Sequence, residues 1–557
     1  MSYLEQLITF PNVTLAAIAE YLLLIKSLPS YCSSNSHIGI FAAVLVVNYV
    51  LYGVFWVVVH PRFMSPLRFL PGPRSLLSVI HRSLLETARP PGELYVDLAN
   101  QYPKKELLHI SLLEEQLFIT KPRLLADLLV HRSYDFIKPS HLSGLLRHVL
   151  GDGLVIVEGS QHKFLRKNTM PAFHFRHIKN LYPMMWAKSI SLTLALQQEL
   201  TGTPTVGERV DSGVIELTAW ASRVTLDIIG IAVMGRSFNM LQKSTDPLLN
   251  IYEQLLEPQR EKIAFAVAAI VFGMRTVRLL PWKINARFRQ LTNSLNEICR
   301  PMIQEKRDAI VKNGDDHFDI LSLLIKSNNF SDEELKDQLL TFLAAGHETT
   351  ASAITWACYL LATHQEMQHK LRKEVLEALP SNSLLDTSDM EDLAGTLEQL
   401  PYLNGIINET LRLYPTVPVT LRQAIHDTHI AEYPIPKGTV LVLSIWQINR
   451  STEVWGTDAD KFIPERWITE AGKPNQTGGA NSNYDFVTFL HGPRSCIGQN
   501  FARAEMRCLL AAMATSFSWE LAMDQAKVLP RGVITIKPAH GLYLKLQPLQ
   551  REKATQG

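Results

Sequence analysis

The sequence has few cysteines, and they do not form a recognisable set. Five cysteines are spread over 557 residues, with no CxxC pair among them. An odd number of scattered cysteines indicates neither a disulfide framework nor a structural zinc site. Most of them are expected to be small buried hydrophobic residues, so each thiol is judged by its own surroundings. The five positions are Cys32, Cys299, Cys358, Cys496 and Cys508.

Net charge is also nearly absent. The formal net charge of +2 at pH 7 gives the chain no overall positive field of the kind that attracts nucleic acid, and we expect no nucleic-acid partner. From about Leu70 onward the chain has no linker rich in proline, glycine or serine, no charge block and no repeat of fixed period. Residues 62–557 are therefore predicted to form one large domain behind an N-terminal region, residues 1–61.

The longest stretch without a charge lies in that N-terminal region. Residues 38–59 read IGIFAAVLVVNYVLYGVFWVVV, and a helix of this length, at ~1.5 Å per residue, spans the roughly 30 Å hydrocarbon core of a bilayer. Arg62, Arg68 and Arg74 follow, and their charge predicts that the bulk of the chain faces the cytosol. A cleaved signal peptide is the competing interpretation, but the run is too long and starts too late.

An earlier apolar segment, residues 7–25, leaves the number of membrane crossings open. It contains Pro11, Asn12 and Glu20, so it is either a second span or an interfacial helix. One crossing places the N-terminus in the lumen, and two return it to the cytosol. Glycosylation of Asn12, in the sequon NVT, would report the difference.

Beyond the anchor, helical patterns outnumber strand-like runs. The segment Pro71-Gly72-Pro73 is stiff and poorly helical, and is either an ordinary linker or a spacer that holds the body at a fixed angle to the membrane. Strand-like runs such as Leu107–Ile119 and Gly438–Ile445 are short. The patterns predict a mainly α body with a minor β region.

The strongest motif surrounds Cys496, in the sequence FLHGPRSCIGQNFAR that starts at Phe489. Glycine and proline precede Cys496, and apolar residues recur at helical spacing after it, which predicts a loop-to-helix junction. At such a junction the unpaired backbone N–H groups and the positive end of the helix dipole stabilise a thiolate, the form of cysteine that ligates a metal.

The full spacing FxxGxRxCxG resembles the haem-binding loop of the cytochrome P450 family at every fixed position. The resemblance implies haem b as the cofactor and Cys496 as the thiolate ligand of its iron, the metal in this site. It also implies that Arg494 pairs with a haem propionate, that Phe489 packs beside the loop and that Gly498 lets backbone amides approach the sulfur. A thiolate ligand favours cleavage of the O–O bond.

A long helix is predicted upstream of this loop. Ser331-Asp-Glu-Glu334 is a capping box that opens a helical run to about Leu361, ~45 Å long if unbroken. Inside it, the sequence AGHETT, Ala345–Thr350, places a glycine and two threonines where they cost about 1 kcal/mol or more relative to better helix formers. Either a neighbouring helix packs closely there, or the backbone yields space for a ligand.

The sequence AGHETT resembles the family's oxygen-activation motif, AGx(D/E)T(T/S). The resemblance implies that Glu348 and Thr349 are catalytic, with Thr349 assisting dioxygen activation and Glu348 supplying protons through water. His347 is expected to occupy a variable position and to point elsewhere.

Two further motifs are expected to meet in space. Glu409 and Arg412 in ETLR are i,i+3 neighbours on a helix, and on most helices such a pair is solvated and worth a few tenths of a kcal/mol. Downstream lies the sequence FIPERW, which contains Arg466. The family resemblance implies that Arg466 joins Glu409 and Arg412 in a buried structural triad.

The remaining cofactor residues are also assigned by resemblance. Arg422 is expected to be a second propionate clamp, and Arg166 fits a position where the family commonly has arginine. His162 stands where the family commonly has tryptophan, but it can still donate a hydrogen bond to a carboxylate. Lys163 and Lys167 form either a docking patch for an acidic flavoprotein or an ordinary solvated face.

The matches run in the family's order from Pro71 to about Arg507. They imply a cytochrome P450 fold with an N-terminal transmembrane anchor, in a microsomal, fungal-type monooxygenase. They also imply an endoplasmic reticulum membrane location with the catalytic domain facing the cytosol. NADPH-cytochrome reductase, and a cytochrome b-type donor, would supply electrons, because no flavin or nicotinamide domain is expected in this chain.

The expected substrate is an apolar small molecule of secondary metabolism, such as a terpenoid, polyketide or alkaloid. Its contacts are expected from Lys138–Val155, Phe342–Ala345 and Val417–Thr420. The apolar run Ile263–Phe272 is too short to span a bilayer, and is either a buried core helix or a segment that dips into the membrane.

Two other functions remain open at this point. The first is a haem-thiolate isomerase or dehydratase that rearranges a peroxide without oxygen, although the family's members of that type usually lack the acid–threonine pair that Glu348 and Thr349 resemble. The second is a membrane-bound binding protein that is not an enzyme, with an inert Cys496.

Overall fold

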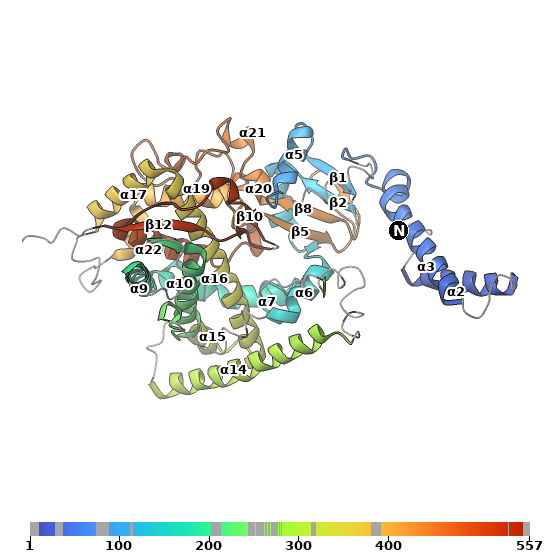
Figure 1. The fold of residues 1–557 in the computed structure, drawn as a ribbon, viewed down its shortest axis with the longest axis horizontal. Coiled ribbons are helices and arrows are strands. Elements are labelled where there is room, and N and C mark those ends of the chain that lie inside the picture. Colours follow the sequence, from blue (N-terminus) through green and yellow to red (C-terminus); the bar gives the residue numbers. More distant parts are fainter. Residues whose placement is uncertain are drawn as a thin grey trace, which may run out of the picture.

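The computed structural model describes most of the chain. The described residues are 10–27, 37–73, 89–111, 115–201, 213–242, 281–313, 319–379, 392–532 and 534–549, with single positions between 251 and 279. The fold is mainly helical with a minor β region, as predicted (Figure 1). The predicted run Ile263–Phe272 lies outside the described residues, apart from Ala264, Phe265 and Ala268.

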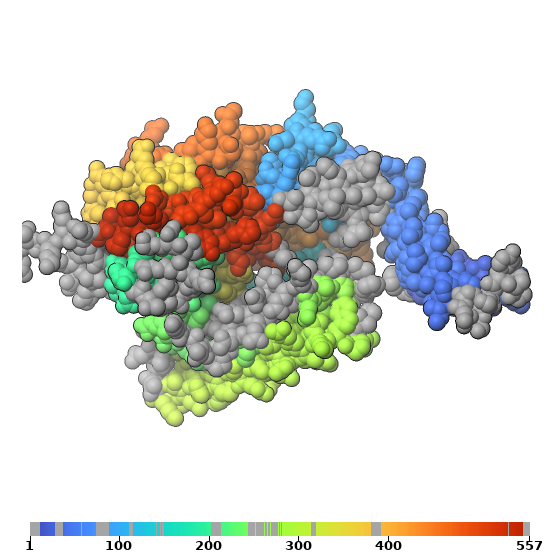
Figure 2. Space-filling model, viewed as in Figure 1, coloured from blue at the N-terminus to red at the C-terminus, as the bar shows by residue number. Residues whose placement is uncertain are grey.

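Two helices at the N-terminus stand away from the main body. They are α2 (Phe10–Ser27) and α3 (His37–Val54), and the helical path continues from α3 through η2 (Phe55–Met64). Figure 2 shows them projecting from one end of the molecule. The stretch His37–Met64 is long and apolar enough to cross a membrane. Leu217–Met234 passes the same test, but 72% of it is buried inside the body, so it is a core helix.

The segment after η2 is fixed to the body at β1 (Leu107–Ser111). The His109 backbone N–H donates to the carbonyl oxygen of Pro71 at 2.8 Å. Gly72 has a φ of +152°, and a Cβ at that position would lie 2.0 Å from the carbonyl oxygen of His109. Only glycine permits this close approach, so Pro71-Gly72 is held against the sheet.

The main sheet joins segments from distant parts of the chain. Its strand order is β1-β2-β8-β5-β3. β2 and β8 are parallel, with Gln116 opposite Val440, and the other pairs are antiparallel. The run Leu107–Ile119 thus contains two paired strands. The strands after β1 are β2 (Glu115–Ile119), β3 (Phe136–Ile137), β5 (Val419–Ala424) and β8 (Val440–Ser444).

Three smaller sheets lie elsewhere in the described structure. One has the order β4-β12-β9, and the other two are the pairs β6-β7 and β10-β11. Their strands are β4 (Val214–Glu216), β6 (Thr428–Ile430), β7 (Tyr433–Ile435), β9 (Phe517–Leu521), β10 (Pro530–Arg531), β11 (Lys537–Pro538) and β12 (Tyr543–Pro548).

The helix α16 (Asp332–Thr363) runs through the helical part of the body (Figure 1). Ser331 is its N-cap and forms the predicted capping box with Glu334. It packs against α10 (Leu217–Ile229), α14 (Lys283–Asn313), α19 (Pro401–Leu413) and α22 (Gln499–Ser516). Its middle is therefore held from several sides, which fixes the position of the AGHETT segment.

Shorter helices complete the body. They are α5 (Glu93–Gln101), α6 (Ser140–Leu150), α7 (Gly159–Thr169), α8 (Phe175–Lys179), α9 (Tyr182–Thr201), α15 (Ile320–Lys326), α17 (Gln365–Ala378), α18 (Leu393–Gln399), α20 (Ile445–Ile448) and α21 (Thr452–Trp455). Most of the buried apolar side chains belong to one continuous core that includes α9, α10, α16, α19 and α22.

Candidate active site

A cavity of about 280 Å³ lies between the middle of α16 and the Cys496 loop. Its wall is largely apolar, with Leu154, Phe173 and Phe342 among its residues. The structure brings most of the predicted site residues to this one cavity, although they come from widely separated segments. These are Cys496, Arg494, Arg166, Arg422, His162, Phe489, Gly498 and Thr349.

The backbone of the Cys496 loop is held tightly before α22 begins. The Cys496 N–H donates to the carbonyl oxygen of Phe489 at 2.8 Å. Gly492 has a φ of +74°, and a Cβ there would lie 2.1 Å from the carbonyl oxygen of Leu129, so glycine is required. These contacts leave the Cys496 side chain exposed to the cavity.

Opposing effects act on the thiol. Burial raises the pKa of Cys496, while a hydrogen bond from the Gly498 backbone amide and the charge of Arg166 act to lower it. A Cβ on Gly498 would meet nothing within 4 Å, so packing within the chain does not require this glycine. The Gly498 amide and Arg166 are the described groups that favour the thiolate over the thiol.

Arg166 and Arg494 connect the loop to the rest of the site. Arg166 Nη1 donates to the carbonyl oxygen of Ser495 at 2.7 Å. Arg494 Nη1 donates to the carbonyl oxygen of Phe136 at 2.5 Å, and Nη2 lies 2.5 Å from a carboxylate oxygen of Glu158. The Nε atoms of both arginines are buried without a hydrogen-bond partner among the described residues.

Two further basic side chains face the same region. Arg422 Nη1 donates to Thr420 Oγ1 at 3.1 Å and to the Leu421 carbonyl oxygen at 2.8 Å, and burial lowers its pKa to about 10. Lys138 Nζ lies 3.3 Å from Glu158. Burial lowers the pKa of Lys138 to about 8, although the charge of Glu158 opposes this shift.

His162 is neutral in this setting. Burial, with Arg494 and Lys138 nearby, lowers its pKa to about 4. Its Nδ1 lies 3.2 Å from the Tyr134 hydroxyl, so when that hydroxyl donates to Nδ1, Nε2 carries the proton. A neutral histidine at the cavity wall can donate one hydrogen bond to a carboxylate.

The charges around the cavity fit a cofactor that carries two carboxylates. Lys138, Arg166, Arg422 and Arg494 line the cavity, and the carboxylate of Glu158 pairs with two of them. One carboxylate does not balance these four basic side chains, and the propionates of haem would add negative charge. The buried Nε atoms of Arg166 and Arg494 would also gain partners, since unpaired buried donors are costly. The residues present therefore fit haem, with Cys496 as the iron ligand.

On the other side of the cavity, the Thr349 side chain of α16 lies in the cavity wall, whereas the Glu348 side chain does not. Thr349 lines the cavity, and its hydroxyl donates to the Ala345 carbonyl oxygen at 2.6 Å. Glu348 is not in the cavity wall among the described residues; its carboxylate lies 3.3 Å from Lys537 Nζ. The predicted acid and hydroxyl therefore have different surroundings.

Helix packing explains the glycine in the AGHETT segment. A Cβ on Gly346 would lie 2.5 Å from Ile229 Cδ1 of α10, so α10 approaches too closely for a side chain there. The helix stays continuous through this segment. His347 is buried, and its Nδ1 lies 2.9 Å from the Leu343 carbonyl oxygen, so it points away from the cavity as expected.

Three functional candidates were not found from the sequence. Lys138 was noted only as the start of a substrate-contact segment, and Glu158 has no motif. Glu505, on α22, is completely buried beside the Thr350 hydroxyl, and burial raises its pKa well above the usual value. Thr350 lines the cavity, so a fully buried carboxyl group lies directly behind the cavity wall. In the sequence, Glu505 could have been recognised as a lone acidic residue among the apolar residues of a predicted helix.

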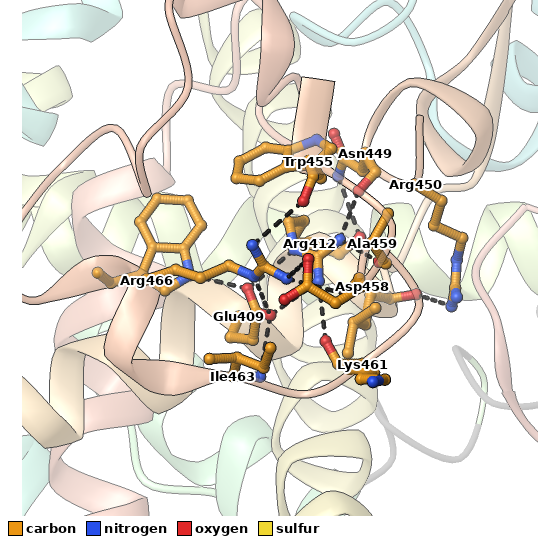
Figure 3. A network of polar contacts seen from close by, with 12 residues as sticks. Glu409, Arg412, Asn449, Arg450, Trp455, Asp458, Ala459, Lys461, Ile463 and Arg466 are labelled. Atoms are coloured by element: carbon orange, nitrogen blue, oxygen red, sulfur yellow. Dashed lines mark hydrogen bonds and ion pairs between the residues drawn. The ribbon is translucent and has the colours of Figure 1, made fainter. Parts of the chain in front are cut away.

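The predicted triad forms a compact network away from the cavity (Figure 3). Arg412 donates to Glu409 through Nε at 2.8 Å and Nη2 at 2.7 Å, and both side chains are fully buried. Arg466 Nε lies 3.5 Å from the same carboxylate, and Trp467 Nε1 donates to it at 2.9 Å. Arg412 also bonds the carbonyl oxygens of Asn449, Ala459 and Lys461.

This network connects α19 to the loop that carries Arg466. A buried ion pair is stable only when its remaining donors and acceptors are satisfied, and here backbone carbonyls and an indole satisfy them. None of the three charged residues lines the cavity. Their arrangement can hold segments together but cannot act directly on a molecule in the cavity.

The expected substrate segments contribute unequally. From Lys138–Val155 the cavity wall includes Lys138, Leu154 and Val155, and from Phe342–Ala345 it includes both end residues. From Val417–Thr420 it includes Thr420. Lys163 and Lys167 are exposed, and Lys163 Nζ lies 4.3 Å from the centroid of the Tyr134 ring.

The sequence is similar to known proteins over nearly its whole length. Residues 70–544 match the family described as Cytochrome P450. The chain is 39% identical to the cytochrome P450 monooxygenase sphH of Aspergillus fumigatus, over 94% of this chain and 96% of that protein. It is 37% identical to the cytochrome P450 monooxygenase ptmK of Penicillium ochrochloron, over 88% and 96%. It is 36% identical to the cytochrome P450 monooxygenase FUM15 of Gibberella moniliformis, over 91% and 92%.

Proposed function

Because this chain belongs to the cytochrome P450 family and is a monooxygenase of that family, we propose that it inserts one atom of dioxygen into an apolar small molecule of fungal secondary metabolism. A terpenoid, polyketide or alkaloid intermediate is the substrate class. The observation that carries this proposal is the cavity itself, in which the Cys496 side chain and Thr349 lie in the wall of the same apolar space.

Haem b is the proposed cofactor, bound through Cys496. When bound, haem supplies two kinds of chemistry that amino-acid side chains lack, namely reactions with dioxygen and electron transfer. The chain's own part is to position it: Arg494, Arg422, Arg166 and His162 hold its carboxylates, and Lys138 adds a further positive charge. Phe489 packs beside the loop, as its place in the cavity wall supports.

Proton supply and substrate binding are assigned to the opposite wall. Thr349 holds a hydroxyl in the cavity, and Glu348 supplies protons from the Lys537 side of α16 through water. Phe173 and Phe342, whose ring centroids lie 5.3 Å apart, would pack against an apolar substrate and keep water from the reacting atoms. The apolar wall favours a substrate with little charge.

The proposed setting is the endoplasmic reticulum membrane, with the body in the cytosol. The stretch His37–Met64 supports a membrane anchor by its length and composition, and Arg62 and Arg68 follow the apolar run on the body's side. NADPH-cytochrome reductase is the proposed electron donor, with a cytochrome b-type protein as a second donor.

A labelling experiment with natural substrate tests this function. An extract from a strain that lacks the gene supplies the accumulated precursor, and microsomes containing the enzyme and reductase are given NADPH under ¹⁸O₂. The expected product carries one ¹⁸O atom and forms only when NADPH is present. Conversion of the precursor without NADPH, or of an added hydroperoxide at full rate, would instead support the peroxide-rearranging alternative.

A further inference from the structure

The two N-terminal helices pack against each other. Thr14 Oγ1 in α2 lies 2.6 Å from the Tyr49 hydroxyl in α3, and the rings of Tyr21 and Phe41 are 5.2 Å apart at an angle of 68°. As the residue number rises along α2, the number of its partner in α3 falls. The two helices are therefore antiparallel, and the start of α2 lies beside the end of α3.

A small residue lies in the contact between them. Ala17 in α2 is completely buried, although neither helix belongs to the main body of the protein. Small side chains allow two helix backbones to approach closely, which is the usual basis of helix packing within membranes.

The outer surface of the pair is apolar. Large hydrophobic side chains on both helices are more than half exposed, whereas in water such side chains would be expected to turn inward. Large exposed apolar patches of this kind mark a contact surface. The side chains that are more than half exposed are Leu15, Leu22, Leu23, Ile38, Val46, Val47, Val50 and Leu51.

Polar side chains pair across the helices instead. Asn48 Nδ2 donates to Glu20 Oε2 at 2.7 Å, which gives the acid of α2 a partner on α3. A polar group inside a membrane is expensive unless it is paired in this way. The hydrogen bond and Glu20 are themselves exposed, so the pairing lowers the cost of this acid without burying it. The exposed aliphatic side chains of both helices are the feature that indicates lipid, not water, as the surrounding solvent.

The dimensions fit two crossings. Each helix has 18 residues and is therefore ~27 Å long, close to the roughly 30 Å of a hydrocarbon core. Nine residues, 28–36, separate them. An extended chain of that length reaches up to about 30 Å, more than enough to join the neighbouring ends of two packed helices, whose axes lie about 8–10 Å apart. Lys26 lies in the last turn of α2, where its amine can reach the headgroups.

We infer that α2 and α3 form a hairpin that crosses the bilayer twice, with the N-terminus on the same cytosolic side as the catalytic body. An interfacial α2 would lie across the axis of a spanning α3, whereas the contacts Thr14–Tyr49 and Tyr21–Phe41 pair the two helices in antiparallel order. The inference rests on the membrane anchoring proposed above. The end of α2 and the start of α3 then lie at the lumenal side of the bilayer.

Glycosylation mapping of the full chain in microsomes tests this topology. One variant carries an N-terminal flexible extension with an Asn-Ser-Thr sequon, and a second carries the same sequon in a spacer inserted between Ser27 and His37. The matched control is the first variant without residues 10–27, which leaves α3 as a single crossing. We expect a glycan on the control and on the insertion variant, and none on the extended full chain.

Glycosylation of the extension on the full chain would overturn the hairpin, because it places the N-terminus in the lumen. An unmodified insertion variant would overturn it as well, because the inserted sequon would then not reach the lumen. Carbonate extraction distinguishes a different membrane topology from a loss of membrane attachment. A chain that stays in the membrane pellet keeps its anchor in either case, whereas release into the supernatant would contradict the membrane anchoring itself.

Discussion

The carboxylate of Glu348 lies 3.3 Å from Nζ of Lys537, so the acid of the AGHETT segment is paired with β11. Thr349, the next residue, faces the cavity and bonds the Ala345 carbonyl oxygen. No hydrogen bond joins the two side chains, so in the proposed function a proton would pass between them through at least one water molecule. This arrangement would separate the source of the proton from the place where it is used.

Loss of the acid should therefore reduce turnover without emptying the site. We expect Glu348→Gln to lower the NADPH-dependent turnover by about 100-fold, a typical contribution of a positioned proton donor, with more reduced oxygen released as peroxide. Lys537→Ala is the matched control. Both partners are at least a third exposed, so the pair is worth less than about 1 kcal/mol and turnover should change little. Full turnover in Glu348→Gln would exclude this residue as the proton source.

Removal of Arg166 should loosen haem. Arg166→Ala deletes a hydrogen bond to the Ser495 carbonyl oxygen beside Cys496 and one buried positive charge. Because charge-assisted hydrogen bonds contribute about 1.5–3 kcal/mol, we expect haem to transfer to excess apomyoglobin about tenfold faster or more. Arg176→Ala, at an exposed position on α8, should behave as wild type. Equal rates in the two variants would contradict a role for Arg166 in holding haem.

The Glu409–Arg412 pair should control stability. Glu409→Ala leaves the guanidinium of Arg412 fully buried without its carboxylate, which costs about 3–5 kcal/mol. We expect a lower denaturation midpoint and faster proteolysis of the purified protein. Lys373→Ala, which breaks an exposed i,i+4 pair with Glu377, should shift the midpoint very little. A Glu409→Ala variant as stable as the Lys373→Ala variant would show that the network is dispensable.

Glu505 should make stability depend on pH. Burial raises the pKa of Glu505 in the folded state above its unfolded value of about 4.3. The folded state therefore binds the proton more tightly, and stability falls as pH rises from about 4.3 towards the folded pKa. Glu505→Gln removes this dependence, so its stability relative to wild type should increase between pH 4 and pH 8. A difference in melting temperature that stays constant over this range would contradict a raised pKa for Glu505.

Local patterns predicted the parts of the structure that short segments determine. The Ser331 capping box and the helix that follows it depend on neighbouring residues, and α16 extends only to Thr363, two residues beyond the predicted end. The junction at Cys496 is similar, since Gly492 and the residues after Cys496 fix the loop and the helix locally. The sequence did not divide Leu107–Ile119 into β1 and β2, because no glycine or proline separates the two strands.

Contacts between distant segments were predictable only through the family resemblance, or not at all. Nothing in the separate motifs brings Arg466 next to Glu409. The partners Lys138 and Glu158 meet because α7 begins beside the segment after β3, which no local pattern encodes. The close approach of Ile229 to Gly346 likewise depends on the packing of α10 against α16, so the sequence alone left two explanations for that glycine.

The reduced carbon monoxide spectrum of Cys496→Ala tests the central claim most directly. With haem ligated by the Cys496 thiolate, the wild-type protein should show the red-shifted Soret band typical of thiolate ligation, and Cys496→Ala should lack it. Cys358→Ala, at a buried cysteine outside the cavity wall, should keep the band. A Cys496→Ala variant with an unchanged band would place the iron ligand elsewhere and contradict the account.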